Sequence, residues 1–186
     1  MSETQGFLRN VRVPALRAPA ALPATIRVDD PSPVLAAHYA AIATTRMAGL
    51  PFLNPALEVE VAQCRRLAGD WLAVVITPWS ILLTLVFGGG ALWRDAGQGE
   101  RVRCELPVGE MAFIADVGEN GLGPFLYCPL IAPAQGIESQ ACARAIAAEA
   151  IDACLQAAPV LMPQADRSDS EPQGLTRRTF LLGRRV

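Results

Sequence analysis

The segment from Trp71 to Trp93 carries no charged residue, and this run of 23 residues limits the possible folds more than any other feature of the chain. A run of that length with Trp at both ends has the outline of a membrane-spanning helix. Three features count against a helix: the β-branched stretch 74–77, Pro78 in the middle, and the glycines 88–90. We therefore predict two buried strands interrupted at Pro78, and no stable insertion into a membrane.

The residues before this run predict a helix. Ser32 can cap a helix start at which Pro33 suits the first turn, and Gly49 followed by Pro51 ends the helix. Spacing along the helix predicts an apolar face made of Leu35, Tyr39 and Ile42. His38 lies beside that face, and we interpret it as a structural histidine rather than a ligand.

Alternating patterns predict the remaining strands. Before the apolar run, Glu58 and Glu60 are expected on one strand face, and the other face is expected to hold Leu57, Val59 and Val61. Further strands are expected at 71–77, 80–87, 102–106, 110–117 and 124–131. The pair Asn120-Gly121 predicts a hairpin between the last two of these strands.

A second helix is expected to begin after Ser139, which can cap it, and to run to about Ala158. Its apolar face is expected to hold Cys142, Ile146, Ala150, Ile151, Cys154 and Leu155, so that both cysteines belong to the core. The order of these elements predicts an α+β fold, in which an antiparallel β-sheet of about five or six strands packs against an N-terminal and a C-terminal helix.

The composition divides the chain into four segments. Residues 1–30 are rich in Ala, Pro and Arg and are expected to form a flexible arm. They are not expected to be a secretion signal, because Arg residues interrupt the apolar stretch that such a signal needs. Residues 31–159 are predicted to form a single α+β domain, residues 160–175 a polar linker, and residues 176–186 an Arg-rich tail.

Charge and residue counts argue against several classes of function. The net charge of -2 provides no basic field for binding nucleic acid. The five cysteines are odd in number and contain no C-x-x-C pair, and the chain has one histidine, so we expect no metal site. No motif for a nucleophilic, zinc-dependent or phosphate-binding active site is present. We therefore expect a protein that is not an enzyme.

Large aromatic residues gather instead at turns and proline-containing segments, namely Phe52, Trp71, Trp79 and Trp93. Trp is enriched at binding hot spots, where one truncation can cost about 2 kcal/mol or more. The alternative, in which all four belong to the core, stays open because Trp is largely buried on average. It is weaker for Trp79, which follows a proline at an expected bend.

Several short sequence blocks carry a recognisable pattern: Phe52-Leu53-Asn54-Pro55, Trp71 with Val75-Ile76-Thr77-Pro78-Trp79, Leu92-Trp93, Leu106-Pro107-Val108-Gly109 with Met111 and Phe113, and Tyr127-Cys128-Pro129-Leu130. Together they resemble the HybE/HupJ hydrogenase-maturation family. The run through Thr77-Pro78-Trp79 is the most specific block, and residues 177–185 resemble the Arg-rich ending of that family. The resemblance covers residues 34–158 and the tail, and it does not extend to the N-terminal arm.

The resemblance implies a cytoplasmic chaperone for [NiFe] hydrogenase biogenesis, without catalytic activity and without a bound cofactor. The implied partner is a precursor subunit: the small subunit with its twin-arginine signal peptide, or else the large subunit. Two other functions stay open. One is a thiol-redox or oxygen-protection factor that acts through Cys128 or Cys64, and the other is a structural partner of the mature enzyme.

Physical reasoning supplies the candidate binding residues. Those expected to contact a partner within the domain are Phe52, Asn54, Pro55, Glu58, Glu60, Thr77, Pro78, Trp79 and Trp93. The aromatic and proline residues at 52–55 and 77–79 are expected to border a groove. Glu58 and Glu60 are expected to meet a guanidinium together, and the alternative is a pair of solvated surface acids.

The tail adds Arg177, Arg178 and Phe180 to the candidate residues. Residues 176–181 read Thr-Arg-Arg-Thr-Phe-Leu, which is the pattern of a twin-arginine export signal. The tail cannot act as that signal, because no apolar segment follows the pattern. We expect the tail to imitate the partner, either in its own chain or in the neighbour of a homodimer. The alternative is a last strand or a solvated basic end.

Overall fold

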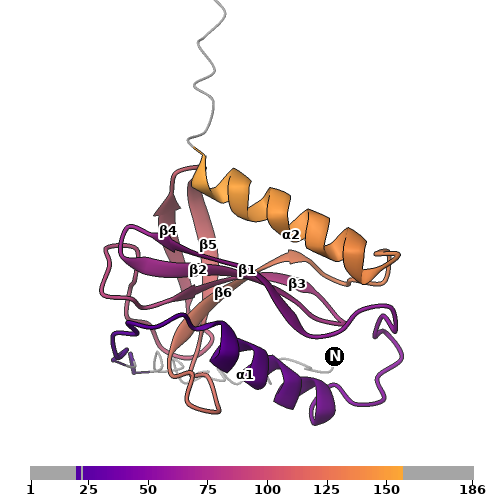
Figure 1. Cartoon of the computed structure of the whole chain (residues 1–186). Helices are drawn as coiled ribbons and strands as arrows, with labels where there is room; N and C mark the ends of the chain where they lie inside the picture. Colours follow the sequence, from indigo (N-terminus) through magenta and orange to yellow (C-terminus); the bar gives the residue numbers. More distant parts are fainter. Residues whose placement is uncertain (1–19, 22, 157–186) are drawn as a thin grey trace, which may run out of the picture.

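Two helices cover opposite faces of a six-stranded antiparallel sheet (Figure 1). The computed structural model describes residues 20–21 and 23–156 of the chain. Helix α1 (Ser32–Thr44) lies against one face of the sheet, and helix α2 (Gln140–Leu155) lies against the other. The α+β fold that the sequence predicts, with an antiparallel sheet between an N-terminal and a C-terminal helix, is confirmed.

The strands are β1 (Glu60–Leu67), β2 (Asp70–Ile76), β3 (Ile81–Val86), β4 (Arg101–Leu106), β5 (Gly109–Asp116) and β6 (Phe125–Ile131). Their order across the sheet is β1-β2-β3-β6-β5-β4, so β6 inserts between β3 and β5. The predicted hairpin joins β5 to β6, and Asn120 and Gly121 in its loop have the positive φ angles, 57° and 78°, that this turn chemistry favours.

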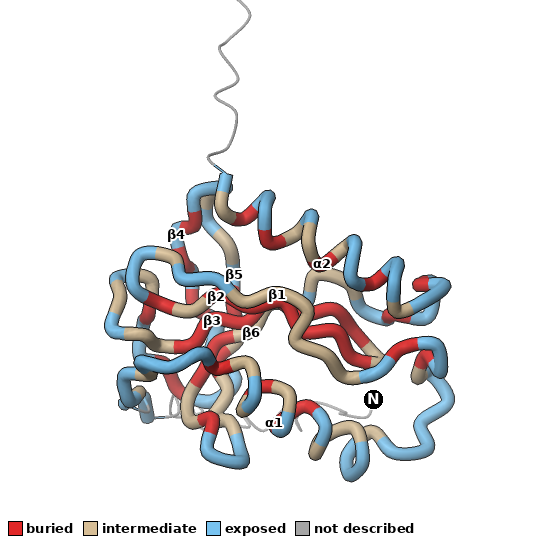
Figure 2. The backbone as a smooth tube through the Cα atoms, viewed as in Figure 1, coloured by how far each residue is buried: buried red, intermediate tan, exposed pale blue. Residues whose placement is uncertain are grey.

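Burial on both faces of the sheet explains the long apolar run. Leu72, Val74 and Ile76 of β2 pack beneath α2, whereas Ala73 and Val75 pack on the side of α1. All residues of β3 are buried in the same way, which Figure 2 shows as the red centre of the sheet. A strand covered on both faces places an apolar side chain at nearly every position, so the period-two pattern disappears. In the part of the chain that the structure describes, no helix has the length and hydropathy needed to cross a membrane.

The glycines that end this run pack around a buried carboxylate. Asp70 is fully buried, and its two oxygens accept hydrogen bonds at 2.9–3.0 Å from the backbone amides of Gly88, Gly90, Leu92 and Trp93. A Cβ atom on Gly90 would lie 2.5 Å from the amide nitrogen of Asp70. This loop therefore requires glycine at position 90 because the two backbones approach so closely.

The start of α1 differs from the expectation. The residue that precedes the helix is Pro31, and no side chain caps the helix there. Instead, Asp30 Oδ1 accepts hydrogen bonds from the amide and the hydroxyl of Ser32, at 2.8 and 2.5 Å. The Ser32 hydroxyl is bonded to this carboxylate and not to a backbone amide of the helix. The prediction that Ser32 caps this helix is therefore wrong.

The start of the first strand also differs. β1 begins at Glu60, so Glu58 lies outside the strand. Leu57 packs beneath α2, whereas Val59 and Val61 pack on the side of α1. The expected alternation from Leu57 to Val61 is therefore wrong, because the chain enters the sheet only at Glu60.

Helix α2 begins as predicted. The Oγ atom of Ser139 accepts a hydrogen bond from the amide of Cys142 at 3.2 Å. The buried face of the helix consists of Ala143, Ala147, Ile151 and Cys154. Cys142 is exposed, because it lies about 100° around the helix from Ala143. The prediction of a core position is therefore wrong for Cys142, and it is confirmed for Cys154.

Part of the expected N-terminal arm is attached to the sheet. The amide of Arg27 donates to the carbonyl oxygen of Phe87 at 2.8 Å, and the carbonyl oxygen of Arg27 accepts from Trp71 Nε1 at 3.0 Å. The guanidinium of Arg66 donates to the carbonyl oxygen of Val28 at 2.7 Å. These bonds hold residues 27–28 against the ends of β2 and β3.

Candidate functional site

A groove opens between α1 and the sheet, and we call it the α1 groove. Its volume is about 500 Å³. The lining side chains come from α1, from the segment after it, from the bend after β2, from strands β3, β5 and β6, and from the residues after β6. They are His38, Tyr39, Ile42, Phe52, Trp79, Ser80, Leu82, Asp116, Phe125, Tyr127, Pro129, Ala132 and Pro133. Cavities that hold ligands commonly have volumes of about 300–1,000 Å³.

The groove exists because one short helix cannot cover this face of the sheet. α1 has 13 residues, which makes it about 20 Å long and about 10 Å wide. Neighbouring strands lie about 4.8 Å apart, so the helix covers little more than two of them. α1 packs against β1 and β2. Side chains of β3, β6 and β5 on the same face extend beyond the helix and form the floor of the groove.

Aromatic rings from β6 and α1 meet in this floor. His38 packs edge-to-face against Tyr39 and Phe125, with ring centroids 5.1 and 5.3 Å apart. Tyr127 follows on β6, with its ring centroid 6.1 Å from that of Phe125. Burial is the main cause that raises the pKa of Tyr39 and Tyr127, and the Asp116 carboxylate raises both further. Both phenols therefore keep their protons at neutral pH.

Two of the predicted binding residues lie together on the rim. Phe52, from the segment after α1, is 38% exposed, and Trp79, from the bend after β2, is half-buried. Both side chains line the α1 groove, although 27 positions separate them in the chain. The structure thus brings the segments 52–55 and 77–79 to one cavity.

Asn54 holds these two segments together. Its backbone amide donates to the carbonyl oxygen of Pro78 at 2.8 Å. Its side-chain Nδ2 donates to the carbonyl oxygens of Ala134 and Ile137, at 3.0 and 2.7 Å. Asn54 is buried and does not line the groove, so its role in this structure is to position the rim.

Thr77 stabilises the bend after β2 through hydrogen bonds to the backbone of Ser80. Its Oγ1 accepts from the amide of Ser80 at 2.9 Å and donates to the carbonyl oxygen of Ser80 at 2.7 Å. Thr77 is fully buried, and neither Thr77 nor Pro78 lines the groove. These contacts fix the loop that presents Trp79.

The groove carries a carboxylate at the end of β5. Asp116 Oδ1 accepts one long hydrogen bond, 3.3 Å, from the amide of Gly118. The neighbouring Glu119 forms an ion pair with Arg46, and its amide donates to His38 Nδ1 at 3.1 Å. Burial lowers the pKa of His38, although Asp116 and Glu119 act in the opposite direction. His38 is therefore neutral at pH 7, and the negative charge of Asp116 dominates the groove.

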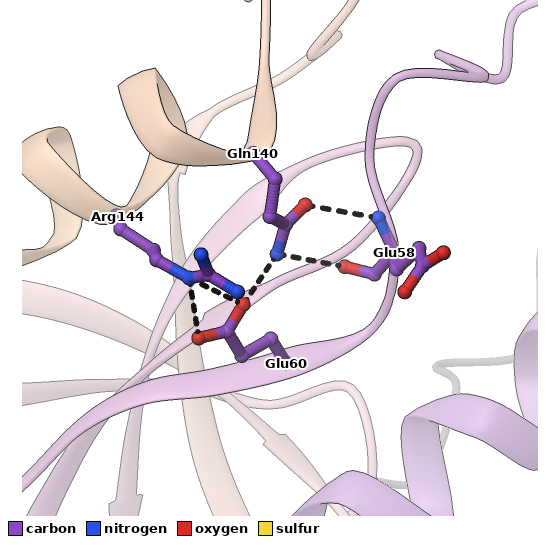
Figure 3. Close-up of polar contacts among 4 residues, drawn as sticks. All are labelled: Glu58, Glu60, Gln140 and Arg144. Carbon is purple, nitrogen blue, oxygen red and sulfur yellow. Dashed lines mark hydrogen bonds and ion pairs between the residues drawn. The ribbon is translucent and has the colours of Figure 1, made fainter.

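The predicted pair Glu58 and Glu60 lies elsewhere, on the side of the sheet that α2 covers (Figure 3). Arg144 Nε donates to both oxygens of Glu60, at 2.8 and 2.9 Å, and Gln140 Nε2 adds a bond of 2.6 Å. The Glu58 carboxylate points away from this cluster, and its backbone amide donates to Gln140 Oε1 at 3.0 Å. Glu60 therefore meets a guanidinium within its own chain. A contact of either glutamate with a partner remains a prediction.

The remaining candidates are not part of the groove. Trp93 is 9% exposed and belongs to the core beneath α2, where its Nε1 donates to Asp95 Oδ1 at 2.8 Å. Pro55 is exposed and does not line the cavity. The candidates of the tail, Arg177, Arg178 and Phe180, lie outside the described residues.

Asp116, Phe125 and Tyr127 line the groove but are not among the binding residues predicted from the sequence. The hairpin pattern contained a partial signal, because Asp116 pairs with Phe125 in register. The signal was incomplete because the position of β6 beside β3, which brings these residues near Trp79, is not encoded by any local pattern.

The environment of two cysteines opposes a role in thiol chemistry. Burial raises the pKa of Cys64 to about 11 and also raises the pKa of Cys128. A reactive thiol needs the opposite shift, because the thiolate is the nucleophile. These two sites are therefore poorly suited to the redox alternative.

Comparisons with known proteins agree on one family. A family model described as "[NiFe]-hydrogenase assembly, chaperone, HybE" matches residues 30–183. The hydrogenase expression/formation protein HoxT of Azotobacter vinelandii is 38% identical over 133 residues, which are 71% of this chain and 84% of that protein. The hydrogenase-2 operon protein HybE of Escherichia coli (strain K12) is 33% identical over 105 residues, which are 56% of this chain and 64% of that protein.

A solved structure agrees with these matches. The fold is similar to the solution structure of HybE from Escherichia coli, with a TM-score of 0.58 and 26% sequence identity. The superposition covers 87% of this chain and 94% of the other.

Proposed function

The chain belongs to the HybE family of [NiFe]-hydrogenase assembly chaperones, and we propose that it binds a precursor subunit of a [NiFe] hydrogenase in the cytoplasm, before that subunit is assembled and exported. The client is the small subunit with its twin-arginine signal peptide, and the large subunit is the alternative. The α1 groove takes the client. The observation that supports this proposal is an open, mainly apolar cavity of about 500 Å³ with Phe52 and Trp79 on its rim.

The chemistry of the groove suits a segment of polypeptide. A twin-arginine signal combines cationic side chains with a Phe-Leu pair and a following apolar segment. The groove offers aromatic and aliphatic surface for the apolar side chains and a carboxylate for a cation. Trp at the rim of a cavity is typical of the residues that contribute most to binding.

We also propose that the protein acts by binding alone. A nucleophilic mechanism needs a nucleophile beside a free base. The Ser80 hydroxyl lies 3.2 Å from that of Thr77 and is buried, and His38 Nδ1 accepts an amide hydrogen bond. Among the described residues that line the groove, no nucleophile and base are paired.

Binding of separate precursors tests the proposal. The full-length protein is immobilised and presented with the small-subunit precursor, the same subunit without its signal peptide, the large-subunit precursor, and the mature enzyme. We expect retention of the small-subunit precursor and a loss of at least about tenfold in affinity when the signal peptide is absent. Stronger retention of the large subunit would favour the alternative client. Equal retention of the mature enzyme would indicate a structural partner instead of a chaperone.

Thiol labelling separates this proposal from the redox alternative. Cys64 and Cys128 are expected to react slowly in the native protein and at the rate of a free thiol after unfolding. A fast-reacting thiol at either position in the native protein would favour the redox function.

A further inference from the structure

No described cation neutralises the carboxylate of Asp116, in contrast to three glutamates of the described chain. Glu119 is paired with Arg46, Glu60 with Arg144, and Glu110 with Arg103. Within residues 23–156, no Arg nitrogen lies within 4 Å of Asp116, and its one hydrogen bond comes from the Gly118 amide at 3.3 Å. Asp116 is half-buried at the edge of the groove. Most of its capacity to accept hydrogen bonds is therefore open toward the cavity.

Aromatic rings lie next to this carboxylate on the same face of the sheet. Asp116 pairs in register with Phe125, and Ile114, two residues earlier on β5, pairs with Tyr127. Phe125 and Tyr127 both line the groove, and their rings lie 6.1 Å apart at 37°. The negative charge of Asp116 raises the pKa of Tyr39 and Tyr127, which places the carboxylate within electrostatic reach of both phenols.

A carboxylate beside aromatic rings matches the guanidinium group of arginine. The planar guanidinium donates two parallel hydrogen bonds to a carboxylate and stacks on an aromatic face at the same time. An ammonium group makes a weaker match, because it is a compact, strongly hydrated point charge. A metal ion is a poor match, because the described residues hold no group of three or more acidic, cysteine or histidine side chains that could bind one, and the neighbouring Glu119 is paired with Arg46.

We propose that Asp116 and Tyr127 form a subsite for an arginine guanidinium of the bound polypeptide, while the rim of Phe52 and Trp79 takes an apolar side chain of the same polypeptide. The proposal rests on the proposed function, because it assigns a recognition role to residues within the α1 groove. It also changes the expected source of the acidic contact. Glu60 is already occupied by Arg144 on the other side of the sheet, so the client arginine meets Asp116 instead.

A short peptide tests the subsite independently of any hydrogenase subunit. The probe is acetyl-Thr-Arg-Arg-Thr-Phe-Leu-amide, which copies residues 176–181 of this chain and carries both features of the proposed ligand. Two matched peptides replace both arginines with lysine or with glutamine. Binding to the full-length protein is measured by calorimetry and by the NMR shift of the His38 ring, which belongs to the one histidine of the chain and lines the groove.

Two protein variants complete the experiment. Asp116→Asn removes the charge and keeps the shape, and Glu105→Gln removes the same charge from an exposed position on β4. We expect Asp116→Asn to weaken binding of the arginine peptide by about tenfold or more and to leave the glutamine peptide unchanged. Glu105→Gln should behave as the wild type. The wild type should bind the arginine peptide more tightly than the lysine peptide. Circular dichroism before and after thermal unfolding verifies that both variants are folded.

The outcomes distinguish the subsite from the proposed function. Equal affinity of the arginine peptide for the wild type and Asp116→Asn overturns the subsite, as does equal affinity of the wild type for the arginine and glutamine peptides. If the precursor still binds through its signal peptide in that case, the proposed function stands without the subsite. If the peptide results hold but neither precursor is retained, the subsite stands and the proposed function fails.

Discussion

The carboxylate of Asp70 accepts a hydrogen bond from the backbone amide of Gly90 at 2.9 Å, and this contact joins the first residue of β2 to the loop that follows β3. Three more amides of the same loop donate to Asp70. A buried carboxylate is tolerated in a core when donors of this kind surround it. The contacts also direct the loop so that Trp93 enters the core beneath α2.

Replacing Asp70 by asparagine should destabilise the domain. The amide group of Asn offers one acceptor oxygen where two are used, and it turns a donor toward backbone amides that are themselves donors. We expect a loss of about 3 kcal/mol or more in the free energy of unfolding, measured by urea denaturation. Asp95→Asn is the matched control, because it retains the Oδ1 acceptor used by Trp93 Nε1. A similar small loss in both variants would contradict this account.

His38 should make the domain less stable in mild acid. Burial lowers the pKa of His38 in the folded state, whereas an exposed histidine titrates near pH 6.5. The unfolded chain therefore binds a proton first as the pH falls, and the free energy of unfolding decreases below about pH 6.5. Each unit of difference between the two pKa values corresponds to about 1.4 kcal/mol at a pH below both.

Urea denaturation at pH 7.5 and pH 5.5 measures this effect. His38→Asn is the control, because it keeps an acceptor for the Glu119 amide but does not titrate. The variant should lose less stability than the wild type between the two pH values. An NMR titration of the His38 ring with a midpoint at or above pH 6.5 would show that the assignment is wrong.

The ion pair of Glu60 with Arg144 should contribute modestly to stability. The side chains are 31% and 58% exposed, and exposed pairs contribute about 0.2–1 kcal/mol. The hydrogen bond from Arg144 is the main cause that lowers the pKa of Glu60. The ion pair therefore stabilises the fold fully at pH values above the pKa that Glu60 has in the unfolded chain. This stabilisation is lost as the pH falls through the lower pKa that Glu60 has in the folded protein. We expect Glu60→Gln to lower the free energy of unfolding by about 1 kcal/mol at pH 7.

Glu58→Gln is the matched control for Glu60. The Glu58 side chain is exposed, and its described hydrogen bonds come from the backbone. We expect Glu58→Gln to change the free energy of unfolding by no more than about 0.5 kcal/mol, measured by urea denaturation at pH 7. Equal losses in the two variants would indicate that the contact with Arg144 does not stabilise the fold.

Local patterns predicted the elements of the fold better than the site. The cap at Ser139 and the hairpin at Asn120-Gly121 depend on residues close together in the chain, and both appear in the structure. The groove combines residues from α1, β3, β5 and β6, and their proximity depends on the order of strands in the sheet. Trp93 was selected as a binding residue for its type, and its burial follows from a long-range contact of its amide with Asp70.

Trp79 should be the main apolar contact of the client. Its side chain is half-buried on the rim of the groove, and its backbone carbonyl makes the contact with the Ala134 amide that holds the bend. Trp79→Ala should therefore leave the domain folded and weaken precursor binding by about 2 kcal/mol, or roughly 30-fold. Trp93→Ala is the contrasting variant and should destabilise the core. If Trp79→Ala unfolds the domain to the same extent, Trp79 is a core residue and not a binding residue.

Removal of the C-terminal tail should strengthen client binding. Residues 176–181 carry two arginines followed by Phe180 and Leu181, which is the pattern that the α1 groove is proposed to take from the client. A ligand tethered by a short flexible linker has an effective concentration of about 1 mM. A tail with an intrinsic dissociation constant of about 0.1 mM would then reduce the apparent affinity for a client roughly tenfold. Truncation after Gly174 should therefore raise the apparent affinity for the client by the same factor.

Binding of the signal peptide to the truncated and full-length proteins measures the difference, and size-exclusion chromatography detects a dimer that exchanges tails. The double variant Arg177→Gln, Arg178→Gln keeps the length of the chain and should reproduce the effect of truncation, because it removes the cations that Asp116 would accept. Weaker client binding after truncation would show that the tail belongs to the client site. If truncation alone strengthens binding and the double variant does not, the tail obstructs the groove by its bulk and not by imitating the client.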